Sequence, residues 1–142
     1  MHFWKKLISI GTVLASGCAS APKSIEAPIA SVLPGTWGFS ETEECSRDPQ
    51  TISFSPDGKK MYVAYRLAGE AGSGDIRKTF TYRVGAQTGN LLRLNLDGET
   101  RASPTGDPVS WDLVLLNRDS FCWHRNDWRE DECTKAVLRC II

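Results

Sequence analysis

The sequence predicts an all-β fold, a small antiparallel barrel of about eight strands, with a two-sheet β-sandwich as the alternative. Three observations lead to this prediction. Apolar and polar side chains alternate through several segments of strand length. Turn-forming Gly, Pro and Asp residues recur every 8–12 residues or so, roughly the spacing of sandwiches and barrels. Outside a turn or two at residues 126–135, no segment shows a convincing helical period.

The elements follow in order along the chain. The first strand opens with Gly35-Thr36-Trp37, and later strands are expected at residues 51–54, 60–67, 76–84, 92–96, 109–115, 121–123 and 137–141. Ser55-Pro56-Asp57-Gly58 and Asp97-Gly98 supply turns, and Asp97-Gly98 predicts a tight hairpin. Alternation predicts the inner rows Met61, Val63, Tyr65, Leu67; Phe80, Tyr82, Val84; Leu92, Leu94, Leu96; Val109, Trp111, Leu113, Leu115; and Phe121, Trp123.

The N-terminal residues indicate export. Lys5 and Lys6 precede an apolar run at residues 7–15. This run is far shorter than the ~20 apolar residues that a membrane-spanning helix needs. A basic start, a short apolar segment and small residues behind it are typical of a secretory signal peptide. We therefore expect the leader to be removed.

The stretch Leu14-Ala15-Ser16-Gly17-Cys18 resembles the lipobox of bacterial lipoproteins. The resemblance implies a signal peptide at residues 1–17 and acylation of Cys18 by fatty acids such as palmitate, which anchor the protein in a membrane. The residue after Cys18 is Ala19 and not aspartate. In lipoproteins of this type, that implies sorting to the outer membrane, with the domain facing the periplasm or the exterior. An ordinary secretory cut after Ala21 is the alternative, but Pro22 suits a scissile position poorly.

Composition divides the exported chain into a tether and one domain. Residues 18–34 hold three prolines and no aromatic residue, and we expect a lipidated cysteine followed by a flexible tether. Residues 35–142 are expected to form the barrel domain. The whole chain has 17 basic and 17 acidic residues, and loss of Lys5 and Lys6 leaves a net charge near −2. No nucleic acid is expected as a partner, because binding it requires a basic face.

Four cysteines remain in the expected domain, and an even number in an exported protein predicts two disulfides. A zinc site is the alternative, but no C-x-x-C pair is present. Three pairings are open. If the last two strands form a hairpin centred near residue 131, Cys122 lies opposite Cys140 within disulfide reach. Cys45 then pairs with Cys133.

Gly35-Thr36-Trp37 at the start of the domain and Arg139 in its last strand resemble the lipocalin-type G-x-W pattern. In that family the tryptophan closes the barrel base beneath an arginine from a late strand. The resemblance implies a lipocalin-like barrel with Trp37 and Arg139 as a structural pair. A barrel of this size is filled by side chains or holds one small ligand. The alternative is that Trp37 is an ordinary core aromatic.

The residue patterns do not indicate an enzyme. The chain has no G-x-S-x-G elbow, and His124 lies in an expected strand, where a lone histidine is usually structural. The acidic cluster at residues 127–132 lacks EF-hand spacing, so neither a metal nor another cofactor is expected. Trp123 and Trp128 flank this loop and either close the barrel end or form a partner-binding patch.

Binding is therefore the expected role, and three functions stay open. The barrel holds an apolar small molecule, or it binds an envelope protein in the manner of an inhibitor or immunity-type lipoprotein, or it is a structural envelope component. The membrane itself is a partner through the lipid anchor. For a protein partner, the candidate loop is the glycine-rich stretch with Gly69, Gly72, Ser73, Gly74 and Asp75.

Overall fold

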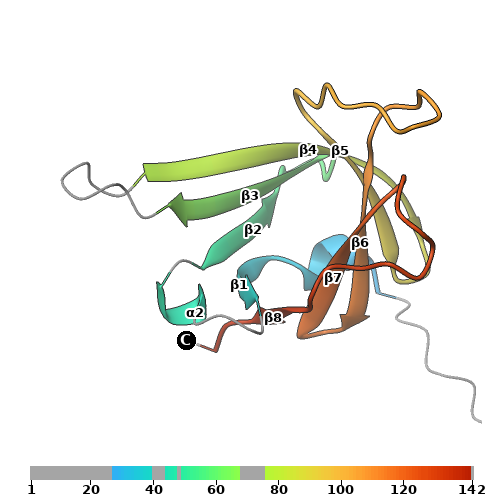
Figure 1. Cartoon of the computed structure of the whole chain (residues 1–142). Helices are drawn as coiled ribbons and strands as arrows, with labels where there is room; N and C mark the ends of the chain where they lie inside the picture. The colour runs from blue at the N-terminus through green and yellow to red at the C-terminus, as the bar shows by residue number, and fades with distance from the viewer. Residues whose placement is uncertain (1–26, 40–43, 48, 68–75, 142) are drawn as a thin grey trace, which may run out of the picture.

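The computed structural model describes residues 27–39, 44–47, 49–67 and 76–141. Its strands form a closed antiparallel barrel in which each strand pairs with the next along the chain and the last returns to the first (Figure 1). The predicted small barrel is confirmed, and the sandwich alternative is wrong. The elements are α1 (Ile29–Val32), β1 (Gly35–Phe39), α2 (Glu44–Arg47), β2 (Gln50–Phe54), β3 (Lys60–Leu67), β4 (Ile76–Thr88), β5 (Leu91–Leu96), β6 (Trp111–Asn117), β7 (Ser120–Arg125) and β8 (Val137–Arg139).

The alternating pattern places the apolar rows inside the barrel. Buried members of the predicted inner rows are Met61, Val63, Tyr82, Leu92, Leu94, Val109, Leu113, Leu115, Phe121 and Trp123. Tyr65, Phe80, Val84, Leu96 and Trp111 are partly buried and pack against them. Successive side chains of a strand point to opposite faces, so one face of each strand supplies the core.

Aromatic rings contact one another across the interior. Trp37 and Phe121 meet edge to face with ring centres 4.9 Å apart, and Phe121 meets Trp123 in the same way at 5.7 Å. Tyr82 stacks on Trp123 at 5.6 Å. Such pairs contribute about 0.5–1.5 kcal/mol each beyond the burial of their surface. These rings join strands β1, β4 and β7, which lie apart in the strand order, into one core.

A bulge in β4 helps the sheet to close. The register of β4 against β5 shifts between Val84 and Gln87. Gly85 lies within this shift, and a Cβ atom there would stand 3.2 Å from the carbonyl oxygen of Arg93. A bulge bends its strand and increases the local twist. Glycine therefore permits a close backbone approach at a point where the wall curves.

The folded domain begins before the predicted boundary at residue 35. Ile29 of α1 and Leu33 behind it are fully buried and belong to the core of the barrel. The prediction of a flexible tether is therefore wrong for residues 29–34. The two side chains stand four residues apart, so one short helical turn presents both to the barrel interior. Residues 18–26 lie outside the described residues.

The predicted tight hairpin at Asp97-Gly98 is also wrong. β5 ends at Leu96, and the chain passes through residues 97–110 before β6 begins. This connection contains an isolated bridge between Ala102 and Pro108. Gly98 does adopt a positive φ of 78°. An Asp-Gly pair thus supplied the backbone conformation of a turn but did not determine the length of the connection.

The cysteines form two disulfides, as predicted, but with different partners. The pairs are Cys45–Cys140 and Cys122–Cys133. The predicted pairs Cys45–Cys133 and Cys122–Cys140 are wrong. The cause is the register of the last hairpin, in which Phe121 lies opposite Val137. The hairpin is therefore centred near residue 129, not 131, and Cys122 does not lie opposite Cys140.

Contacts of the loop decide this register. Trp123 and Thr134 exchange two hydrogen bonds, from the Thr134 N–H to the Trp123 carbonyl at 2.8 Å and from the Trp123 N–H to Thr134 Oγ1 at 2.9 Å. These bonds hold the end of the loop against β7. The Cα atoms of Cys133 and Cys122 are then 5.8 Å apart. The expected register differs by an even number of residues, so both registers bury the same face, and alternation cannot distinguish them. Residues 126–135 form turns where one or two helical turns were expected.

Candidate functional site

A groove of about 420 Å³ lies on the outer wall of the barrel, over β5, β6 and β7. Leu91, Val114 and Leu116 form its apolar floor. Leu91 pairs with Val114, and Val114 pairs with Cys122, so their outward side chains lie in one row across three strands. The rest of the lining consists of Asp112, Cys122, His124, Glu130, Asp131, Glu132 and Cys133.

The floor of the groove leaves apolar surface in water. Leu116 is 51% exposed. A single exposed leucine is common on protein surfaces. A contiguous apolar surface within a hollow and beside charged residues is instead typical of interaction sites.

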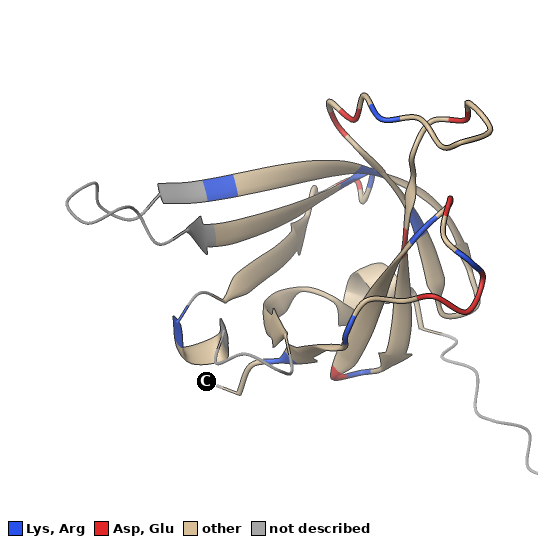
Figure 2. Ribbon diagram, in the orientation of Figure 1, with Lys and Arg blue, Asp and Glu red and all other residues tan. Residues whose placement is uncertain are grey.

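An acidic rim borders the groove. Glu130, Asp131 and Glu132 are consecutive residues on the loop between β7 and β8, directly after Arg129 (Figure 2). Arg129 donates to both carboxylate oxygens of Asp131, at 3.2 and 2.9 Å, and its backbone N–H donates to Glu132. Glu130 has no hydrogen-bond or ion-pair partner within the described ranges. Its carboxylate is therefore free to meet a cation from outside.

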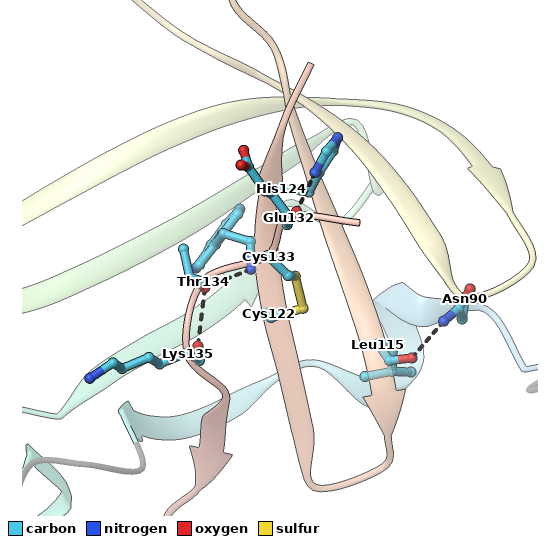
Figure 3. The surroundings of a disulfide bond; sticks show 9 residues. Asn90, Leu115, Cys122, His124, Glu132, Cys133, Thr134 and Lys135 are labelled. Atoms are coloured by element: carbon cyan, nitrogen blue, oxygen red, sulfur yellow. Dashed lines mark hydrogen bonds between the residues drawn. A yellow bond between two sulfur atoms is a disulfide. The ribbon is translucent and has the colours of Figure 1, made fainter. Parts of the chain in front are cut away.

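Several bonds fix the rim against the barrel wall. The Cys122–Cys133 disulfide joins the loop to β7, and Thr134 binds the backbone of Trp123 just beyond it (Figure 3). His124 Nδ1 donates to the carbonyl oxygen of Glu132 at 2.5 Å. His124 thus serves to position the rim. A binding surface that is already rigid loses little conformational entropy when a partner docks.

One buried carboxylate lies at the edge of the groove. Asp112 is 4% exposed, and Arg93 on the neighbouring strand binds both of its carboxylate oxygens through Nε and Nη2. The bidentate geometry is the strong form of an arginine–carboxylate pair. Because this charge is already neutralised, the negative character of the groove comes from its rim.

The structure brings Trp37 and Arg139 together at the α1 end of the barrel. The two residues pair in register between β1 and β8, and the Arg139 guanidinium lies 4.2 Å from the centre of the Trp37 ring. Trp37 Nε1 donates to the carbonyl oxygen of Leu33 at 2.9 Å. Arg139 donates to the carbonyl oxygens of Val32, Pro34 and Arg118 and to the carboxylate of Asp119.

This contact explains the glycine of the G-x-W triplet. Gly35 has a φ of 143°, a conformation that side chains rarely adopt, and a Cβ atom there would stand 2.7 Å from Arg139 Nη1. Glycine at this position therefore leaves the space that the guanidinium occupies. The pair is part of the structural closure of the barrel.

The structure also reveals a residue that the sequence analysis missed. Gln50 is fully buried, and neither its Oε1 nor its Nε2 has a hydrogen-bond partner. Its cross-strand neighbours are Trp37 on β1 and Tyr65 on β3. A buried polar group without a partner costs about 1–3 kcal/mol. The alternation of Gln50 with Ile52 and Phe54 was the available signal, because it places the amide on the inner face of β2.

The two tryptophans of the 126–135 region have different environments. Trp123 is buried and belongs to the core, as expected of a residue that closes the barrel. Trp128 is half-buried, and the Arg125 guanidinium lies 6.0 Å from its ring centre and 5.8 Å from that of Trp111. Arg125 also binds the carboxylate of Asp127 and thereby lowers the pKa of that group.

A second arginine extends this aromatic stack. Arg101 lies 6.0 Å from the Trp111 ring centre and donates to both carboxylate oxygens of Glu99 at 2.7 Å. The hydrogen bonds from Arg101 lower the pKa of Glu99 to about 2. The two arginines of this stack pair with the carboxylates of Asp127 and Glu99, which favours a structural role for the stack.

The other predicted sites cannot be placed in this fold. Cys18 and the loop residues Gly69, Gly72, Ser73, Gly74 and Asp75 lie outside the described residues. In the part of the chain that is described, no group of three or more His, Cys, Asp or Glu side chains is arranged to hold a metal ion. Within the same part, no helix has the length and apolarity needed to cross a membrane.

Comparisons with protein-family models, with curated proteins and with solved structures found no match to this chain.

Proposed function

We propose that this chain is an exported, lipid-anchored envelope protein whose barrel binds a partner protein in the groove beside the Cys122–Cys133 disulfide. The role is binding and not catalysis. The observation that carries the proposal is the groove itself, in which a half-exposed Leu116 stands on an apolar floor beneath a fixed acidic rim. Apolar anchors surrounded by polar groups are the usual anatomy of protein interfaces.

The chemistry of the groove defines the partner. A hollow of about 420 Å³ accommodates a few side chains of an extended segment. The floor of Leu91, Val114 and Leu116 favours an apolar side chain, and the unpaired carboxylate of Glu130 favours a Lys or Arg beside it. The partner is therefore an envelope protein with a segment in which an apolar residue adjoins a basic one. Opposite charges at the rim increase the rate of association and the specificity.

The anchor rests on the stretch Leu14-Ala15-Ser16-Gly17-Cys18, and the two disulfides suit an oxidising compartment outside the cytosol. Several acyl chains on Cys18 would hold the protein almost irreversibly, because each buried methylene contributes about 0.8 kcal/mol. A Cys18→Ala variant should leave the membrane fraction of the native host. Sedimentation of this variant with membranes after a high-salt wash would contradict the anchor.

The groove can be tested by photocrosslinking in the native host. A photoreactive amino acid at Leu116 should give a discrete product with a partner protein, whereas the same group at the exposed Thr51 of β2 should not. Glu130→Lys should abolish the product at Leu116, because it reverses the only rim charge without a partner in the described chain and breaks no ion pair there. A product that persists in Glu130→Lys, or appears equally at Thr51, would refute the groove as the docking site.

One observation favours a second candidate, a small molecule inside the barrel. The buried amide of Gln50 has no partner among the surrounding side chains. This site lies on a different part of the wall, so the two functions can be tested separately.

A further inference from the structure

We propose that the interior of the barrel at Gln50 binds the head of a small amphipathic molecule, and that this head is a primary carboxamide, a lactam or a protonated carboxylic acid. The site is independent of the docking groove. β2 carries Gln50, the groove lies over β5 to β7, and β2 and β6 stand on opposite sides of a ring of eight strands.

The amide of Gln50 has an unused capacity to bind. Its Oε1 can accept and its Nε2 can donate hydrogen bonds, yet both atoms are buried without a partner. The residue is 0% exposed, so bulk water does not supply the missing bonds. Buried polar groups of native proteins are normally paired. An unpaired group of this kind therefore points to a molecule that is absent from the structure.

The shape of a side-chain amide selects the chemistry of the head group. One edge of the amide presents an acceptor and a donor side by side. A primary carboxamide, a lactam or a protonated carboxylic acid presents the complementary pair on one edge and can form two parallel hydrogen bonds. An alcohol carries its donor and its acceptor on a single oxygen and so cannot form two parallel hydrogen bonds, and a dialkylated amide has no donor.

Aromatic side chains near Gln50 can receive the apolar body of such a molecule. Gln50 pairs in register with Tyr65 of β3, and the Tyr65 ring meets that of Phe80 edge to face at 5.6 Å. Both rings are partly buried and pack against the core of the barrel. Lys78, the register partner of Tyr65, lies with Nζ 4.9 Å from the centre of the Phe80 ring. On the inner face of β2 to β4, the buried amide of Gln50 is thus followed by the rings of Tyr65 and Phe80 and then by the exposed Lys78.

The test uses three probes with the same chain and different heads, namely octanamide, N,N-dimethyloctanamide and octanol. Binding to the mature protein is followed by NMR through the side-chain amide signals of Gln50, which are assigned by their loss in Gln50→Leu. Octanamide should shift these signals and bind roughly tenfold more tightly than either other probe, since it forms one more hydrogen bond with the Gln50 amide than each of them does. In Gln50→Leu the preference for octanamide should disappear.

A bound water molecule is the competing explanation, because a buried water could satisfy the same amide. In that case octanamide would leave the Gln50 signals unchanged, or all three probes would bind equally to the native protein and to Gln50→Leu. Either result overturns the proposal. A Thr51→Val variant, altered at the exposed neighbour on the outer face, is the matched control and should bind octanamide as the native protein does.

The outcome does not depend on the docking groove. Glu130→Lys should retain octanamide binding at Gln50, and Gln50→Leu should retain the crosslink at Leu116. Loss of octanamide preference in Glu130→Lys would show that the two regions are one site and would overturn the assignment to Gln50 alone.

Discussion

Trp37 and Gln50 are cross-strand partners on β1 and β2, and both are fully buried, but their polar atoms have opposite environments. The indole N–H of Trp37 binds the Leu33 carbonyl, and its ring lies under the Arg139 guanidinium. The amide of Gln50 binds nothing in the described chain. The comparison separates a position whose polar atoms are bonded within the fold from one whose polar atoms have no partner in the described chain.

The difference also appears in what surrounds each residue. Around Trp37, the donors of Arg139 are used by backbone carbonyls of α1 and of the β6–β7 turn. Around Gln50, the register neighbour Tyr65 belongs to a partly exposed aromatic row. Saturated polar networks stabilise a fold, whereas an unsatisfied buried group reduces its stability.

The largest expected effect is that of Trp37→Ala. This change removes a fully buried ring, its edge-to-face contact with Phe121 and the support of Arg139. It should lower the free energy of unfolding by about 3–5 kcal/mol, as for other buried aromatic residues. Urea unfolding monitored by circular dichroism measures this loss. Trp37→Phe, which keeps a ring, should lose less, and equal losses for the two variants would refute the packing role.

Arg139→Met should have the second largest effect. It leaves the carbonyl oxygens of Val32 and Arg118 without their donor, and bonds from a charged group contribute about 1.5–3 kcal/mol. We expect a loss of about 2–3 kcal/mol in the same unfolding assay. Arg139→Lys should recover only part of it, because a lysine cannot form the same fork of hydrogen bonds. Full recovery by lysine would mean that charge alone matters.

Gln50→Leu should have the opposite sign. It replaces an unsatisfied buried amide by an apolar side chain of similar size, which should raise the free energy of unfolding by about 1 kcal/mol. The same denaturation experiment, carried out without any added ligand, measures the gain. A clear loss of stability would show that Gln50 makes a contact that supports the fold and would remove its contrast with Trp37.

The smallest expected effect is on the pH dependence of stability. It distinguishes the Arg101–Trp111 stack from the Arg139–Trp37 stack. Arg101, beside Trp111, forms an ion pair with Glu99. This pair lowers the pKa of Glu99 from an ordinary value of 4.5 to about 2. A carboxyl group with a lowered pKa stabilises the fold above its unfolded pKa, and this contribution disappears as the pH falls from about 4.5 to about 2. Arg139 binds mostly carbonyl groups, which do not titrate in this range.

Thermal unfolding at about pH 6 and about pH 3 tests this difference. Glu99→Gln should lose less stability between the two pH values than the native protein does, because its side chain has no titrating carboxyl group. An identical pH dependence of the two proteins would mean that the Glu99–Arg101 pair contributes nothing to folding.

The two regions were not equally visible in the sequence. The sequence indicates a structural role for Trp37, because the G-x-W triplet and an arginine in a late strand resemble the lipocalin-type pattern. In the structure, Gly35 leaves the space that Arg139 occupies. For Gln50, alternation with Ile52 and Phe54 indicated only the inner face of β2, and its lack of a partner depends on every side chain around it. The groove was equally hidden, since Leu116 and Glu130 come together only when the last hairpin folds.

The amino-acid sequence by itself determined the strands and their inward faces, because side-chain direction in a strand has a period of two and each barrel strand buries one side. It also determined that the cysteines pair. Only the tertiary structure decided which cysteines pair, because registers that differ by an even number of residues bury the same face, and the Thr134–Trp123 bonds select one of them. Likewise, only the closed barrel decided that Ile29 and Leu33 belong to the core and that the amide of Gln50 is left without a partner, since both follow from how much space the strands enclose.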